Sequence, residues 1–170
     1  MKRFALTAAL LATTALYAAA PTAANYSGKW SLDQTKSQNL PHFYSRVSSQ
    51  TLNIAQTDAT LDVGVEVVQG QQAPDKLDFH YTLDGKENKT ETSIRTVSGI
   101  VKTPAYLKAV VQDAGKLAIT IDRVLPGADG RHVKTNELWS LSADGKLLTV
   151  HRTDDGPLGS RESEMVFVKQ

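Results

Sequence analysis

The chain has 170 residues and a mass of 18.4 kDa, which is enough for one domain with a substantial core. With 41% hydrophobic and 22% charged residues, the composition excludes a disordered polyelectrolyte and a membrane protein with many spans. The formal net charge of +1 gives no electrostatic basis for binding nucleic acid or an anionic membrane. The absence of cysteine excludes disulfides, thiolate zinc sites and a cysteine nucleophile.

The N-terminal residues have the pattern of a secretory signal peptide. Residues 1–3 carry two positive charges, residues 4–17 are apolar apart from three threonines, and small residues follow. The apolar run is rich in alanine and ends before Pro21, which argues against a transmembrane anchor of about 20 residues. We therefore expect a signal peptide at 1–24 and a mature domain at 25–170, located in a bacterial periplasm or outside the cell. No membrane span is expected after cleavage.

The rest of the chain alternates apolar and polar side chains with a period of two, which predicts β-strands. The clearest run places Leu61, Val63, Val65 and Val67 on one face, and the valines favour a strand. The predicted strands contain, in chain order, residues 26–32, 52–54, 61–67, 77–83, 107–111, 117–121, 137–141, 147–151 and 165–168.

Turn residues separate these strands. Four Asp-Gly pairs predict tight turns, because glycine accepts the positive φ that such turns need; the pairs are at 84–85, 129–130, 144–145 and 155–156. The mature chain's prolines are expected between strands, since proline cannot donate a ladder hydrogen bond; they are Pro41, Pro74, Pro104, Pro126 and Pro157.

These strands predict an all-β fold. Strands joined by hairpins form an antiparallel meander, and a sheet with one apolar face must either close on itself or pack on a second sheet. Closure into a barrel also removes exposed strand edges. We therefore expect an antiparallel up-and-down β-barrel of eight to ten strands. The irregular segment 33–48 is expected to cross one mouth, with a helical turn around 43–47.

The first mature strand carries the motif Gly28-Lys29-Trp30. This Gly-x-Trp motif resembles the first strand of lipocalins and fatty-acid-binding proteins, the calycin group. The resemblance implies that Trp30 plugs the closed end of a barrel and that Gly28 lets the chain bend tightly. It also implies a late arginine packed over the tryptophan, for which Arg152 and Arg161 are both candidates.

Other parts of the chain depart from these families. The Arg-x-Tyr pair that grips a carboxylate in fatty-acid-binding proteins is replaced by Met165-Val166-Phe167, and the lipocalin Thr-Asp-Tyr motif is absent. The hairpin at 139–146 is similar to one in exported bacterial lipocalin-like proteins of uncharacterised function. That similarity implies a fold and no activity.

No motif for metal, cofactor or nucleophilic chemistry is present. The four histidines lack metal-ligand spacing, and neither a Gly-x-Ser-x-Gly elbow nor a phosphate-binding loop occurs. We expect His80 and His132 on polar strand faces and His42 in a mouth loop. The adjacent carboxylates at 154–155 are interpreted as part of a polar turn, and Glu162 with Glu164 as one solvated face. We thus predict no catalytic residue, metal or cofactor.

The leading functional hypothesis is a monomer that binds a small apolar ligand in the barrel interior and does not bind nucleic acid. Its pocket is expected to include aromatic residues and one histidine of the alternating strands, together with two aromatic residues at the mouth. The candidate ligand-binding residues are Phe79, Tyr81, Trp139, His151, Phe43 and Tyr44.

Two alternatives remain open at this point. A hydrolase or isomerase would use Glu137 and His151 as inward-facing polar groups, although the opposite orientation, with Leu138, Leu148 and Val150 inward, is favoured. A barrel filled by its own side chains would instead act through its surface as an envelope interaction protein. A cavity of a few hundred Å³ separates a ligand-binding barrel from a filled one.

Overall fold

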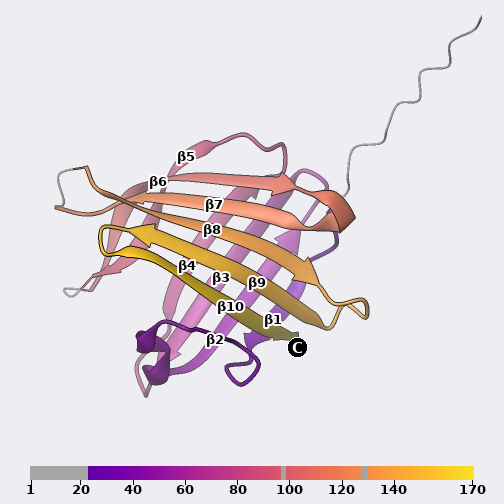
Figure 1. Cartoon of the computed structure of the whole chain (residues 1–170), viewed down its shortest axis with the longest axis horizontal. Coiled ribbons are helices and arrows are strands. Elements are labelled where there is room, and N and C mark those ends of the chain that lie inside the picture. The colour runs from indigo at the N-terminus through magenta and orange to yellow at the C-terminus, as the bar shows by residue number, and fades with distance from the viewer. Residues whose placement is uncertain (1–22, 97–98, 128–129) are drawn as a thin grey trace, which may run out of the picture.

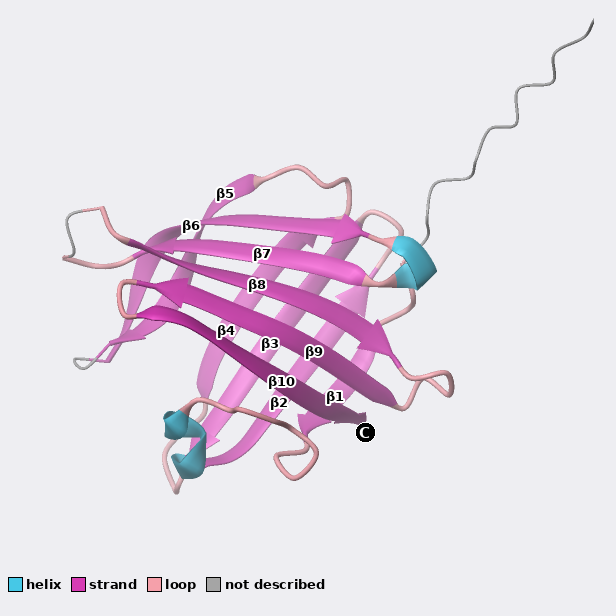
Figure 2. Cartoon of the chain, viewed as in Figure 1, coloured by secondary structure: helices cyan, strands magenta, loops and turns pink. Residues whose placement is uncertain are grey.

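The computed structural model describes residues 23–96, 99–127 and 130–170, and its regular structure is almost entirely β. Besides the strands, the described residues form two short 3₁₀ turns, η1 at His42–Arg46 and η2 at Asp113–Gly115, which are cyan in Figure 2. The strands are β1 Gly28–Leu32, β2 Val47–Gln56, β3 Thr60–Gln69, β4 Asp75–Thr82, β5 Asn88–Thr96, β6 Gly99–Val111, β7 Leu117–Val124, β8 His132–Leu141, β9 Leu147–Gly156 and β10 Gly159–Lys169.

The ten strands form one antiparallel sheet in the order β4-β3-β2-β1-β10-β9-β8-β7-β6-β5. Strands that follow one another in the chain pair as neighbours, apart from β4 and β5, and β1 also pairs with the last strand, β10. The sheet wraps round so that β6 to β10 cover β1 to β4 (Figure 1). The predicted up-and-down barrel is confirmed, but its closure is incomplete, because no ladder joins β4 to β5 among the described residues.

Strand β5 is absent from the sequence prediction because its residues, NKTETSIRT, contain no alternation of large apolar side chains. It is held instead by a continuous ladder with β6, from Asn88 opposite Leu107 to Thr96 opposite Gly99. Partner strands can therefore impose a strand on a segment whose own pattern is weak.

Two turn predictions are wrong. Pro104 lies within β6, opposite Glu91 of β5. Proline has no backbone N–H to donate, but β6 pairs with β7 only from Ala105 onward, so Pro104 lies just outside the β6–β7 ladder. Asp155 and Gly156 are the last residues of β9, and the reversal is made by the next two residues, followed by Gly159 with φ +106°. The Asp-Gly pairs at 84–85 and 144–145 do form turns with positive φ at glycine.

One end of the barrel is packed solid. Trp30 is fully buried there, and its indole Nε1 donates to the Tyr26 carbonyl at 2.9 Å. The Tyr26 hydroxyl, also fully buried, lies 3.0 Å from the carbonyl of Trp139 and 3.1 Å from that of Gly115. Gly28 has φ +136°, a conformation that side chains rarely adopt. This arrangement agrees with the plug and the tight bend that the motif implies.

The side chain over this tryptophan is Lys169, whose Nζ lies 5.1 Å from the ring centroid of Trp30. The expectation of Arg152 or Arg161 in this position is wrong. Arg152 points into the barrel interior and Arg161 is exposed on β10. Lysine can fill the position because an ammonium group also interacts favourably with an indole face.

The opposite end is crossed by residues 33–46, which include η1. This segment is tied to β10 by backbone hydrogen bonds between Gln38 and Glu164 and by the amide of Asp33, which donates to the Val166 carbonyl. The expected helical turn is confirmed as η1, which Figure 1 places at the end of the barrel away from η2.

The proposed signal peptide falls almost wholly on residues 1–22, which lie outside the described residues. Ala24 is described and contacts the solid end, where its amide donates to the Gly115 carbonyl and its carbonyl accepts from Gln56. No helix among the described residues is both long and apolar enough to cross a membrane.

Replacing Tyr26 with phenylalanine should lower the free energy of unfolding by about 1–3 kcal/mol, because the change removes a hydroxyl bonded to buried carbonyl groups. Urea denaturation followed by tryptophan fluorescence measures this. Tyr106→Phe is the matched control, since its hydroxyl makes no hydrogen bond to any described residue, and it should change the free energy by less than about 0.5 kcal/mol. An equal loss in both variants would contradict the role assigned to Tyr26.

Candidate functional site

The half of the barrel beneath η1 is hollow. It contains a cavity of about 550 Å³ whose walls come from β2 to β10 and from η1. One side, on β2 to β4, is mainly apolar, although Gln50, Gln69 and Asp75 also lie on it; its apolar residues are Leu52, Val63, Val65, Val67, Leu77 and Phe79. The opposite side, on β7 to β9, carries charged groups; they are Arg123, Glu137, Arg152 and Asp154.

Five of the six predicted ligand-binding residues line this cavity. Phe79 and Tyr81 come from β4 and Trp139 from β8, while Phe43 and Tyr44 reach the mouth from η1. Burial raises the pKa of the Tyr81 hydroxyl well above its usual value. The role of all five in ligand binding stays a prediction, and the inward orientation of Phe79 and Tyr81 follows from the period of two along β4.

His151 is the exception: it does not line the cavity, so its place among the candidate ligand-binding residues is wrong, whereas the favoured outward orientation of this histidine is correct. Its side chain is 56% exposed on the outer face, where Nδ1 lies 3.2 Å from the Glu164 carboxylate. Register explains the error, because Glu137 is paired with Arg152 of β9 and not with His151. The sequence alternation had two solutions on each strand, and the ladder selects Glu137 and Val150 as inward residues.

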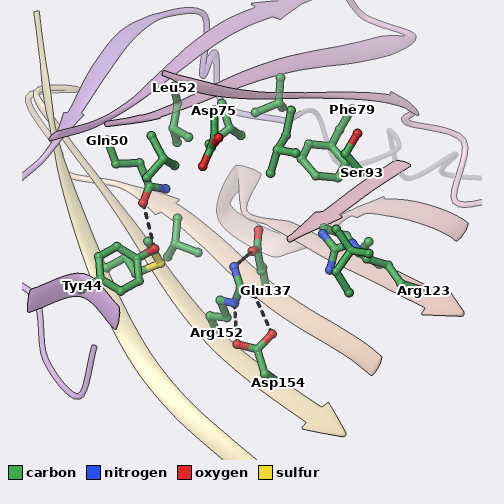
Figure 3. Close-up of a pocket in the computed structure, with 18 of the residues that line it drawn as sticks. Tyr44, Gln50, Leu52, Asp75, Phe79, Ser93, Arg123, Glu137, Arg152 and Asp154 are labelled. Atoms are coloured by element: carbon green, nitrogen blue, oxygen red, sulfur yellow. Dashed lines mark hydrogen bonds and ion pairs between the residues drawn. The ribbon is translucent and has the colours of Figure 1, made fainter. Parts of the chain in front are cut away.

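A charged cluster spans β8 and β9 inside the cavity (Figure 3). Arg152 donates through Nε and Nη2 to the two carboxylate oxygens of Asp154, both at 2.8 Å, and lies 3.5 Å from Glu137. The other carboxylate oxygen of Glu137 accepts the indole N–H of Trp139 at 2.8 Å. Each charged group therefore has a hydrogen-bonded partner, as partly buried charges require.

Asp154 was missed as an interior residue because it was interpreted as part of a polar turn. The ladder extends β9 to Gly156, so Asp154 is a strand residue opposite Thr135, which donates to it at 2.7 Å. Burial favours the neutral acid, but Arg152 and Thr135 outweigh burial, so the pKa of Asp154 lies below its usual value. The alternation Val150, Arg152, Asp154 was the available signal.

A second polar contact lies at the mouth, where the Tyr44 hydroxyl donates to Gln50 Oε1 at 2.8 Å. Burial raises the pKa of Tyr44 to about 12. Gln50 was not predicted as a pocket residue, because it interrupts the apolar pattern of β2. The bond fixes η1 against the start of β2.

Arg123 was also missed and lies apart from the Arg152 cluster in Figure 3. Its guanidinium carbon is 5.6 Å from the ring centroid of Phe79, and one terminal nitrogen is 3.4 Å from the Thr135 hydroxyl. Its buried Nε has no hydrogen-bond partner. Burial lowers the pKa of Arg123 from its usual value, although arginine stays protonated in proteins.

The histidines do not converge. His80 pairs with Asp62 and His132 with Asp122 on the outer surface, as their predicted polar faces require, and His42 lies exposed in η1. Within residues 23–96, 99–127 and 130–170, no group of three histidine or acidic side chains is arranged to hold a metal ion.

Comparison with solved structures finds similar folds, one of which is that of a bile acid-binding protein. No protein-family model matches the chain, and no curated protein matches it. The zebrafish ileal bile acid-binding protein, solved in complex with cholic acid, is 18% identical over 85% of this chain and 98% of its own, with a TM-score of 0.47. The barrel assignment made above depends on this chain's own strand ladders.

Replacing Arg152 with methionine should lower the free energy of unfolding by about 3 kcal/mol at pH 7, because it leaves two carboxylates without their shared cation. The loss should shrink as pH falls from 7 towards 4. In the wild type, the lowered pKa of Asp154 stabilises the fold at every pH above the usual carboxyl pKa of about 4, so this contribution persists over the range. In the variant, acid protonates the two unpaired carboxylates and so removes the cost of burying their charges.

Urea denaturation of both proteins at several pH values measures this difference. Lys108→Met, which removes an exposed positive charge from the outer face of β6, is the control and should behave as wild type. A loss for Arg152→Met that is constant with pH would contradict the assigned ion pairs.

Proposed function

We propose that this protein binds a small, predominantly apolar molecule inside the barrel. The observation that carries the proposal is the cavity of about 550 Å³ in the open half. Ligand sites typically measure about 300–1,000 Å³ and are lined by apolar and aromatic side chains with a few polar groups. This cavity fits that description in both size and lining.

The two alternatives have less support. A filled barrel acting through its surface is inconsistent with the hollow interior. The enzyme hypothesis required Glu137 and His151 side by side, and His151 lies on the outer face beside Glu164. Glu137 instead bonds to Trp139 and contacts Arg152, which suits a group that shapes a pocket.

An uncharged probe tests interior binding. N-phenyl-1-naphthylamine, an apolar dye that fluoresces in non-polar surroundings, should bind and quench Trp139 through energy transfer. Val65→Trp should abolish uptake, because the indole occupies the cavity from the middle of β3. His80→Trp adds the same group on the outer face, where the side chain is 63% exposed, and should leave uptake unchanged.

Far-ultraviolet circular dichroism and thermal melting would establish that both variants fold. Equal dye uptake by the two variants would place the dye outside the barrel. Failure of the wild-type protein to take up the dye, together with bare polypeptide in native mass spectrometry of gently extracted protein, would refute interior binding.

We further propose that the protein is exported. The support is the N-terminal pattern of positive, apolar and small residues. Expression in a Gram-negative bacterium should give a periplasmic product whose intact mass corresponds to residues 25–170. A full-length product in the cytoplasm would contradict export. A longer mature chain that keeps Ala24 would move the cleavage site and preserve that residue's bonds to Gly115 and Gln56.

A further inference from the structure

The two arginines inside the cavity differ in how their charges are neutralised. Arg152 makes two 2.8 Å bonds to Asp154 and approaches Glu137, so its charge is matched within the protein. Arg123 makes no ion pair with any described residue, and its single hydrogen bond is a 3.4 Å contact to a hydroxyl. Only one of its five N–H donors is therefore used.

The carboxylates nearest to Arg123 in the cavity are already engaged. Asp154 accepts from Arg152 and Thr135, and Glu137 accepts from Trp139 and faces Arg152. These two carboxylates attract Arg123 only through longer-range electrostatics, and the positive charge of Arg152 repels it. A partly buried guanidinium without a bonded anion is unfavourable.

The surroundings of Arg123 also fix its position. It is the second-last residue of β7, in the half of the barrel that opens beneath η1, and its guanidinium is held between the Phe79 ring and Thr135. Deeper in the barrel, towards the solid end, the cavity is lined by apolar side chains such as Leu52, Val63 and Phe167. Arg123 thus lies near the mouth, and the apolar wall continues from there towards the floor, opposite the deeper Glu137–Arg152 pair.

We propose that the ligand is an amphipathic acid that enters with its apolar part first and places its oxyanion against the terminal nitrogens of Arg123. This inference rests on the proposed interior binding and adds the ligand's charge and direction. A planar guanidinium matches a carboxylate, sulfonate or phosphate group, and such charge-assisted bonds are about twice as strong as neutral ones. The apolar part would lie deeper, along the wall that contains Leu52, Val63 and Phe167.

Two dyes that differ by one acidic group provide the test. 8-Anilinonaphthalene-1-sulfonate is N-phenyl-1-naphthylamine with an added sulfonate, so a comparison isolates the charge. Arg123→Met should weaken binding of the sulfonate dye by about 10- to 100-fold, the loss of one to two charge-assisted bonds. Binding of the uncharged dye should stay within about twofold. Arg123→Lys, which keeps the charge but not the fork, should give an intermediate loss.

Lys108→Met removes a positive charge from the outer face of β6, between the inward Leu107 and Ala109, and is the matched control; it should bind both dyes as wild type does. Thermal melting should show that Arg123→Met is no less stable than wild type, because the change removes a charge that lacks a bonded anion. An equal loss of both dyes in a folded Arg123→Met protein, or no loss of either, would overturn this inference while leaving interior binding intact. Failure of both dyes to bind the wild-type protein would refute the proposed function itself.

Discussion

The double pairing of β1, with β2 on one side and β10 on the other, is the interaction on which the rest of this structure depends. It joins the first and last strands of the chain and so links β1 to β4 with β5 to β10 in one ten-stranded sheet, which wraps round an interior. Once this sheet exists, the period of two places alternate side chains in an interior that is packed at one end and hollow at the other. The fully buried Trp30 on this same strand fills the end that is closed.

Most of the wall could be predicted because its strands carry their own signal. Leu61 and Val63 on β3, and Leu117, Ile119 and Ile121 on β7, are inward in the structure as their alternation required. Prediction failed where a segment depends on its partners. The polar β5 is a strand only through its ladder with β6, and Pro104 is tolerated within β6 because of where the β7 ladder begins.

The pocket was predictable in its aromatic part and not in its charged part. Phe79 and Tyr81 follow from alternation alone. Trp139, Arg152 and Asp154 are assigned to the interior only when β9 is extended and its register against β8 is fixed. A shift of one residue reverses every side chain of a strand. A charged residue on an ambiguous strand is assigned by default to solvent, and here that default hid the polar side of the cavity.

Both described ends of the chain lie at the solid end of the barrel. Ala24 is bonded to Gly115 beside η2, and the last residues run next to the β8–β9 turn, where the Lys169 amide donates to the Lys146 carbonyl. The protein can therefore be tethered to a support, or joined to another domain, through either of these ends without obstructing the mouth beneath η1. Immobilised preparations would keep their entrance facing free solution.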